Sequence, residues 1–200
     1  MTKTEKLSDL VELRNGYLSA TEAQGLGISR TYIQEYISAN GFERVARGLY
    51  KSHDVWTDYL YIIALKNERA VYSFDTALML NGLTEREPSD IFVTVSRAYN
   101  ASHLRSTGII VNYVRDEWVD LGRTVAKTTY GNEVSVYDME RTICDILRVK
   151  DKKDPQMFVY AIKEYAKSAN KNLPRLMKYA KVLGVEAELR RYMEVLLLLS

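Results

Sequence analysis

The sequence has few residues of the kinds that build disulfides, metal sites and membrane spans. It contains one cysteine, Cys144, and two histidines, His53 and His103. A single cysteine excludes an intramolecular disulfide, as is usual in the reducing cytoplasm. Neither histidine has a companion at metal-ligand spacing. No apolar run approaches the roughly 18 residues of a membrane helix, and the first ten residues lack the apolar core of a signal peptide. We therefore expect a cytoplasmic protein without a metal or a membrane.

Sequence patterns of common catalytic sites are also missing. There is no Walker loop, no G-x-G-x-x-G, no D-x-D and no E-x-K. A magnesium site would need paired carboxylates, and the candidates are Asp75, Asp90, Asp138 and Asp145. Of these, Asp138 is predicted to be a helix cap and Asp145 an exposed helix position. We predict that the protein is not an enzyme and has no catalytic residue or cofactor.

Charge is unevenly distributed along the chain. Residues 1–52 carry seven Lys and Arg against six Asp and Glu, residues 53–149 carry ten against fourteen, and residues 150–200 carry eleven against six. Basic ends around an acidic middle suit a polyanionic partner, and they equally suit a solvated helical surface. The net charge of +2 does not separate these interpretations.

The first 52 residues predict three helices followed by a hairpin. Leu7 and Leu10 have helical spacing, residues 19–22 read as a capping box that opens a short helix, and Ser29 caps a third helix. A glycine-containing turn separates the second and third helices, and residues 42–51 alternate as two short strands hinged at Arg47. This order is typical of a winged helix-turn-helix.

The rest of the chain predicts a mixed domain. Helical patterns occupy about 56–66 and 74–81, strand patterns occupy 90–137, and helices follow from Asp138, one of them opening at Pro155. The predicted fold class is therefore α+β, with a winged helix-turn-helix at 1–52 and a C-terminal α/β domain at 53–200 whose small sheet is packed by helices. An apolar run at 195–199 suits either the domain core or a subunit contact.

The third helix and the hairpin carry the side chains that DNA recognition requires. A recognition helix offers donors from its first turns to base edges in the major groove, and basic wing residues meet the flanking phosphates. The predicted DNA-binding residues are Ser29, Arg30, Thr31, Gln34, Arg44, Arg47 and Lys51. Glu35 and Glu43 weaken the basic character of this face, so a winged helix used for protein contacts is the alternative.

A second basic surface is predicted near the C-terminus. Its residues are Lys163, Lys167, Lys171 and Lys178. Lysines one helical turn apart can contact phosphates, although such a face more often serves solubility.

The chain resembles a known family in several segments spread over nearly its full length. The N-terminal segments are GYLS at 16–19, GISR at 27–30 and FERVARGLY at 42–50. The C-terminal segments are YSFDTAL at 72–78, NGLT at 81–84, IFVTV at 91–95 and YDMERTICDIL at 137–147. Together they resemble the AbiEi-type antitoxins of type IV toxin–antitoxin systems, which act in abortive infection and phage resistance.

The resemblance implies more than the residue patterns do. It implies a transcriptional repressor that autoregulates its operon by binding inverted repeats in its own promoter. It also implies an antitoxin that counters a nucleotidyltransferase-like toxin without forming a stable complex with it. The DNA role falls on the residues named above, whereas no residues follow for the antitoxin role. The segment at 137–147 suits a structural helix equally well.

Two rival functions remain open at this point. A regulator whose C-terminal domain senses a small molecule would have an apolar, ligand-sized pocket. A DNA-modifying enzyme with a winged-helix targeting arm would have a carboxylate cluster in that domain.

Overall fold

The computed structural model describes residues 1–149 and 155–197 and has the predicted mixed α+β composition. The chain divides into two compact units. Unit 1 comprises Met1–Lys66 with Thr128–Asn132, and unit 2 comprises Asn67–Lys127 with Glu133–Ser200.

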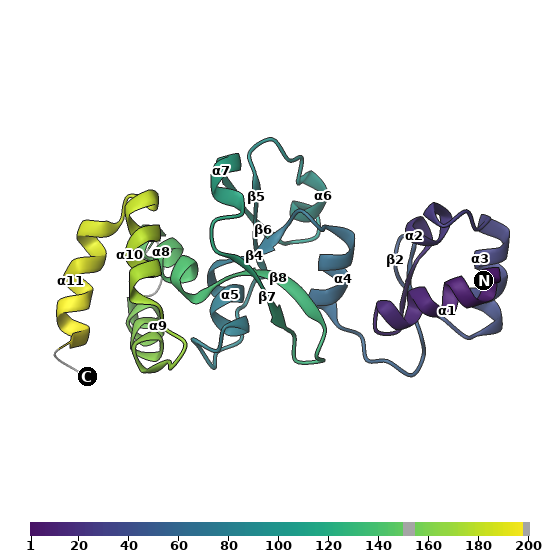
Figure 1. Cartoon of the computed structure of the whole chain (residues 1–200), viewed down its shortest axis with the longest axis horizontal. Coiled ribbons are helices and arrows are strands. Elements are labelled where there is room, and N and C mark those ends of the chain that lie inside the picture. The colour runs from purple at the N-terminus through teal and green to yellow at the C-terminus, as the bar shows by residue number, and fades with distance from the viewer. Residues whose placement is uncertain (150–154, 198–200) are drawn as a thin grey trace. The chain divides into compact units, whose positions relative to one another are not determined.

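Unit 1 combines helices with a small antiparallel sheet whose strand order is β1-β3-β2. Its elements are α1 (Lys3–Leu13), β1 (Tyr17–Ser19), α2 (Ala20–Gly25), α3 (Arg30–Ala39), β2 (Glu43–Ala46), β3 (Leu49–Lys51) and α4 (Tyr59–Lys66). Helices α1 to α3 and the β2–β3 hairpin occur at the predicted places (Figure 1). Strand β1 has too few residues to show alternation, and it forms by pairing with β3.

The core of unit 1 joins α1, β1 and α3. Leu7 and Leu18 are fully buried, and Ile33 with Ile37 forms the buried face of α3. Burial of one such side chain stabilises the fold by about 1.5–3 kcal/mol. Since this face of α3 points inward, the opposite face is left for contacts with solvent or a ligand.

The predicted capping box at 19–22 forms only in part. The Ser19 hydroxyl accepts the amide of Glu22 at 3.4 Å, as a helix cap does. The Glu22 carboxylate forms an ion pair with Arg14 of the preceding segment instead of returning to the cap amide. The Glu22 side chain therefore links α2 to the end of α1 instead of completing the predicted capping box.

Unit 1 extends past residue 52 because of a buried carboxylate, Asp58. Its Oδ1 accepts the amide of Tyr61 at 3.0 Å, and its Oδ2 accepts the Thr128 hydroxyl at 2.5 Å and the Asn132 side-chain amide at 2.7 Å. The amide of Asp58 donates to the Tyr17 hydroxyl at 2.9 Å. A buried carboxylate needs such partners, so α4 and the turn at 128–132 are part of this unit.

Unit 2 is built on a mixed five-stranded sheet of order β6-β5-β4-β8-β7. Its strands are β4 (Val71–Tyr72), β5 (Phe92–Ser96), β6 (Ile110–Val114), β7 (Arg123–Lys127) and β8 (Glu133–Tyr137). Strand β4 pairs antiparallel with β5 and parallel with β8, while β5 and β6 are parallel. The strand-rich region predicted at 90–137 is therefore correct, and the two-residue β4 lies outside it.

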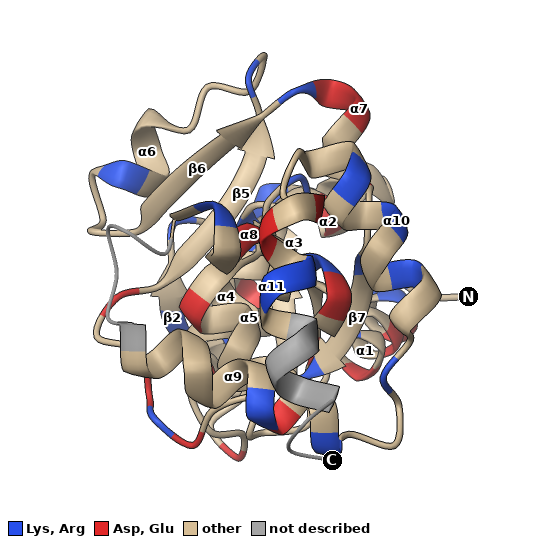
Figure 2. Cartoon of the chain, turned by 90° about the vertical axis from the view of Figure 1, so that its left-hand side faces the viewer, with Lys and Arg blue, Asp and Glu red and all other residues tan. Residues whose placement is uncertain are grey.

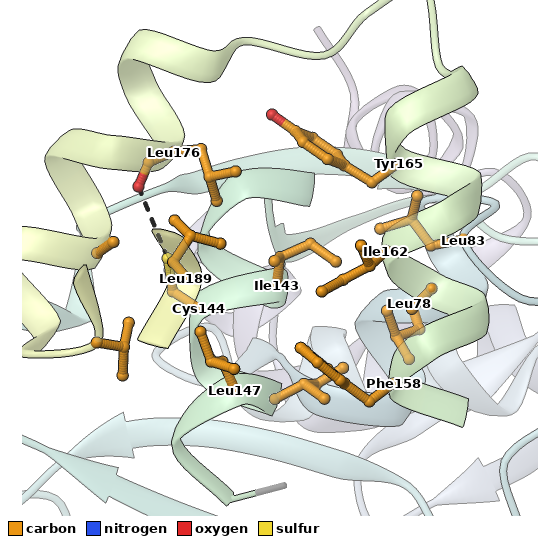
Figure 3. Packing of buried hydrophobic residues seen from close by; sticks show 14 of the residues in the cluster. Leu78, Leu83, Ile143, Cys144, Leu147, Phe158, Ile162, Tyr165, Leu176 and Leu189 are labelled. Atoms are coloured by element: carbon orange, nitrogen blue, oxygen red, sulfur yellow. Dashed lines mark hydrogen bonds between the residues drawn. The ribbon is translucent and has the colours of Figure 1, made fainter. Parts of the chain in front are cut away.

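Helices of unit 2 enclose its main hydrophobic core. They are α5 (Phe74–Leu80), α6 (Ser102–Arg105), α7 (Asp116–Val119), α8 (Met139–Val149), α9 (Pro155–Lys167), α10 (Leu173–Leu183) and α11 (Glu186–Leu197). Figure 3 shows Ile143 and Leu147 of α8 packed among side chains of α5, α9, α10 and α11. Helix α9 begins at Pro155 as predicted, and the side chains of the apolar run at 195–199 lie outside the described residues.

Cys144 is part of this core, as predicted. Its Sγ lies 3.8 Å from the carbonyl oxygen of Leu176 (Figure 3), and burial raises the pKa of the thiol to about 12. A thiol with an ordinary pKa of about 8.5 would be partly ionised at pH 8, but this one is almost wholly protonated.

We therefore expect Cys144 to resist modification by dithiobis(nitrobenzoate) at pH 8 in the folded chain. In about 6–8 M urea, which unfolds the chain, the same thiol should react within minutes. Absorbance of the released thiolate measures both rates. Complete labelling of the folded chain within minutes would contradict the buried position.

Helix α8 also carries a buried polar network, and this corrects one prediction. Asp145 was predicted to be exposed, yet it is fully buried and pairs with the buried Arg141 at 2.9 Å. The Arg141 guanidinium also donates to the carbonyls of Trp118 and Leu121, at 2.8 Å each. A carboxylate can be buried here because this guanidinium partners it.

Other acidic residues at the start of α8 are structural too. Asp138 accepts the amide of Arg141 at 2.8 Å, which agrees with the predicted cap. Burial raises the pKa of the Asp138 carboxyl. Glu140 is buried and accepts the Tyr165 hydroxyl at 3.0 Å and the amide of Asn172 at 2.8 Å. The segment at 137–147 therefore joins α8 to the end of α9 and the start of α10.

Candidate nucleic-acid interface

A concave surface of about 720 Å³ lies on unit 1 between α3 and the β2–β3 hairpin. Helix α2 contributes to one wall, and the last residue of α4 contributes to the rim. The lining residues are Ala20, Thr21, Gln24, Arg30, Thr31, Ile33, Gln34, Arg44, Arg47, Gly48, Tyr50 and Lys66. We call this surface the groove.

Helix α3 presents its polar face to the groove. The Ser29 hydroxyl accepts the amide of Tyr32 at 3.4 Å and so fixes where the helix begins. Arg30 and Thr31 are in the first turn, and Gln34 follows about one turn later, all three exposed. This spacing places them on one side of the helix, next to its buried face, and the buried Ile33 also lines the groove.

The hairpin supplies the second wall. Gly48 has φ of +72°, a conformation that favours glycine and permits the tight turn after Arg47. Arg44 of β2 is opposite Tyr50 of β3, and both line the groove. The turn and the strand pairing therefore bring Arg44 and Arg47 to the same surface as α3.

The groove is lined by cations and by no carboxylate. Its positive residues are Arg30, Arg44, Arg47 and Lys66, all exposed. Within the described residues, none of the three arginines has a carboxylate within 4.0 Å. A concave surface with several unneutralised cations attracts an anionic ligand.

Glu35 and Glu43 weaken this surface less than the sequence suggests. Neither lines the groove. Glu43 forms an ion pair with Lys51 at 3.0 Å, which neutralises its charge beside the hairpin. The local excess of positive charge is therefore larger than the net count for residues 1–52 indicates.

Lys51 lies elsewhere than predicted. It is buried, and besides pairing with Glu43 its Nζ donates to the carbonyls of Ser52 and Val55, at 3.4 and 3.1 Å. Strand alternation explains this position, because Lys51 shares its face of β3 with the buried Leu49. Lys51 stabilises the hairpin and does not line the groove. Ser29 is exposed but also does not line it.

Lys66 is a groove residue that the sequence does not reveal. It ends α4, and its Nζ donates to the carbonyl of Arg47 at 2.9 Å. Tyr50, Thr21 and Gln24 were likewise not predicted. The alternation of β3 could have identified Tyr50, since it points away from Leu49, whereas Lys66 is brought in by the fold alone.

The predicted C-terminal basic residues lie on unit 2. Figure 2 shows basic residues on α10, the helix that contains Lys178, and α9 carries Lys163 and Lys167. Lys167 pairs with Glu164 at 2.7 Å, and the Lys171 ammonium donates to the carbonyl of Ala166. Lys163 and Lys178 are exposed. Two of the four predicted lysines, Lys167 and Lys171, thus have their ammonium groups engaged in local contacts.

Within the described residues, no group of three or more His, Cys, Asp and Glu side chains is placed to hold a metal ion. His103 pairs with the side-chain oxygen of Asn67 at 2.7 Å, and His53 is exposed. In this part of the chain, no helix has both the length and the apolar character needed to cross a bilayer.

The fold and the groove define the chain as an α+β protein with a cation-lined groove on its N-terminal unit. No family model matches the chain, and no curated protein matches it. Among solved structures, it is similar to the crystal structure of the RV2827C protein from Mycobacterium tuberculosis, with a TM-score of 0.54 and 14% identity. The match covers 86% of this chain and 69% of that one, and at this identity it concerns the fold alone.

Proposed function

We propose that unit 1 is a winged helix-turn-helix that binds double-stranded DNA, and that the chain is a non-enzymatic transcriptional repressor. In this proposal α2 and α3 are the helix-turn-helix, α3 enters the major groove, and the β2–β3 hairpin is the wing. The observation that carries the proposal is the groove, which joins the first turns of α3 to basic hairpin residues without a lining carboxylate.

The residues of the groove divide into two roles. Arg30, Thr31 and Gln34 have the donors and acceptors that read base edges, with arginine suited to guanine and glutamine to adenine. Arg44, Arg47 and Lys66 are charges suited to phosphates, which position the protein without reading sequence. Specific binding needs both kinds of contact.

Self-repression through inverted repeats and antitoxin activity extend this proposal through the resemblance to AbiEi-type antitoxins. The antitoxin role is assigned to unit 2, and its partner is a nucleotidyltransferase-like toxin that forms no stable complex with it. A reading frame for such a toxin beside this gene would support the assignment. An unrelated neighbourhood would argue against it.

A small-molecule sensor is the competing function, and it has weaker support. The pockets described on unit 2 have volumes of about 300 and 340 Å³. These volumes are at the low end of the range for ligand sites, roughly 300–1,000 Å³. Charged residues line both pockets, Arg86 with Glu87 in the first and Arg86 with Glu85 in the second.

Substitution of two arginines tests the proposed roles in the full chain. We expect Arg30→Ala to weaken binding to the promoter duplex by about 1–3 kcal/mol and to relax the preference at one base pair. We expect Arg47→Ala to weaken binding to promoter and random duplexes by the same factor. Fluorescence anisotropy with labelled duplexes at physiological salt measures both.

The matched control is Arg97→Ala, which removes an exposed arginine of unit 2. It should leave both affinities unchanged. If Arg30→Ala and Arg47→Ala bound both duplexes as tightly as this control, the groove would not be the DNA-binding surface.

A further inference from the structure

A hydrogen bond inside the groove links the helix to the hairpin. The Nε2 of Gln34, on α3, donates to the hydroxyl oxygen of Tyr50, on β3, at 3.2 Å. Both side chains line the groove. Gln34 is exposed and Tyr50 is half-buried, so an exposed amide is held by a partner that is part of the folded hairpin.

Tyr50 is held firmly by its surroundings. Its strand is the central strand of the small sheet, and Tyr50 lies between Leu18 of β1 and Arg44 of β2. Its ring packs against the hydrophobic core of unit 1. The hydroxyl is therefore at a nearly fixed position, which a side chain at the end of a loop would not provide.

The bond to Tyr50 restricts a side chain that is otherwise free to rotate. A glutamine side chain has several accessible rotamers and loses much of that conformational entropy when it is immobilised. If the side chain is already ordered in the free protein, less conformational entropy is lost when DNA binds. More of the free energy of the base contact then discriminates between the correct and the wrong base pair. Tyr50 is well placed to supply this preorganisation.

The same bond leaves the recognition edge of the amide in place. A glutamine amide carries two N–H donors and one carbonyl oxygen, and Tyr50 takes one donor. The remaining N–H and Oε1 match N7 and the N6 amino group of adenine in the major groove. We propose that Tyr50 is a positioning residue that orients Gln34 to read one adenine.

This inference rests on the proposed DNA-binding function and goes beyond it. A purely structural tie between α3 and the hairpin would make loss of the Tyr50 hydroxyl weaken all duplexes alike or lower the unfolding temperature. If Tyr50 positions Gln34, loss of the hydroxyl should instead reduce the discrimination at one base pair. These consequences are separable by experiment.

The experiment uses the full chain and the tightest duplex that it selects from a random-sequence library. Each adenine of that duplex is replaced in turn by 7-deazaadenine, which lacks the N7 acceptor but keeps Watson–Crick pairing. For the parent chain we expect one position to lose about fivefold or more in affinity on this replacement. Gln34→Ala should show no loss at that position.

Tyr50→Phe is the decisive variant, because it keeps the packed ring and removes only the hydroxyl. We expect it to lose most of the discrimination at the Gln34 position, to retain the affinity for random duplex, and to unfold at the parent temperature. The double variant should match Gln34→Ala. The control is Tyr32→Phe, which removes a hydroxyl that contacts Thr4 at 2.7 Å outside the groove lining, and it should discriminate like the parent.

Gln34→Glu provides a second test that does not depend on Tyr50. Its carboxylate lacks an N–H for N7 and accepts from the N4 amino group of cytosine, so the preference should move from adenine to cytosine at the same base pair. Full discrimination by Tyr50→Phe, or effects of Gln34 and Tyr50 at different base pairs, would overturn the inference. Failure of the parent chain to bind any duplex would instead overturn the proposed function.

Discussion

Replacement of Arg141 by Met is expected to lower the free energy of unfolding of unit 2 by about 3–5 kcal/mol. The substitution removes the partner of Asp145, which is fully buried, and two 2.8 Å hydrogen bonds to the carbonyls of Trp118 and Leu121. It also removes a cation–π contact at 4.3 Å to the ring of Tyr137. The large cost arises because the fully buried carboxylate loses its closest cation and keeps only the Arg148 guanidinium, at 3.8 Å.

Urea titration measures this effect, with the reactivity of the Cys144 thiol reporting on unit 2. The matched control is Arg190→Met, which breaks a pair of the same spacing, 2.8 Å from Glu186, whose arginine side chain is 63% exposed. That pair should contribute no more than about 0.5 kcal/mol. Equal losses for the two variants would contradict a stabilising role for the buried network.

Simultaneous replacement of Arg44, Arg47 and Lys66 by Ala should nearly abolish DNA binding at physiological salt. These side chains line one groove and are assigned to phosphates, so each is expected to release about one counterion when DNA binds. Loss of all three should weaken promoter and random duplexes equally. The unfolding transition should change little, since all three side chains are exposed and belong to no ion pair within the described residues.

The matched control carries alanine at three exposed basic residues of unit 2 outside the predicted second basic surface, Arg69, Arg97 and Lys127. It lowers the net charge of the chain by the same amount. If this control weakened DNA binding as much as the groove variant, total charge and not the groove would account for binding. Electrophoretic mobility shift with both duplexes makes the comparison.

Local patterns predict unit 1 well because its elements are short and clearly delimited. The spacing of Ile33 and Ile37, the cap at Ser29 and the glycine at 48 predict α3 and the hairpin turn, and those elements place Arg30, Gln34 and Arg47. Such signals depend on neighbouring residues alone, so the sequence contains them directly.

The features that the sequence could not predict depend on contacts between residues far apart in the chain. Lys66 reaches the groove because α4 starts directly after Asp58, whose carboxylate is held by Thr128 and Asn132 from a distant part of the chain. Asp145 is predicted to be exposed because a carboxylate is usually solvated, and its burial is explained by its ion pairs with Arg141 and Arg148.

Lys51 illustrates an error that the sequence could have prevented. A lysine in a basic hairpin suggests a phosphate contact, but alternation along β3 puts it on the face of the buried Leu49. Applying alternation before residue type would have assigned Lys51 to the interior and Tyr50 to the groove.

The central claim is that the groove of unit 1 binds duplex DNA through its cations, and the salt dependence of binding tests it most directly. The logarithm of the association constant is measured against the logarithm of salt concentration for the parent chain and the Arg44, Arg47, Lys66 triple variant, with one duplex from upstream of the gene. We predict a linear decrease for the parent and a slope smaller by about 2.7 for the triple variant. Identical slopes, or parent binding that does not depend on salt, would contradict the account.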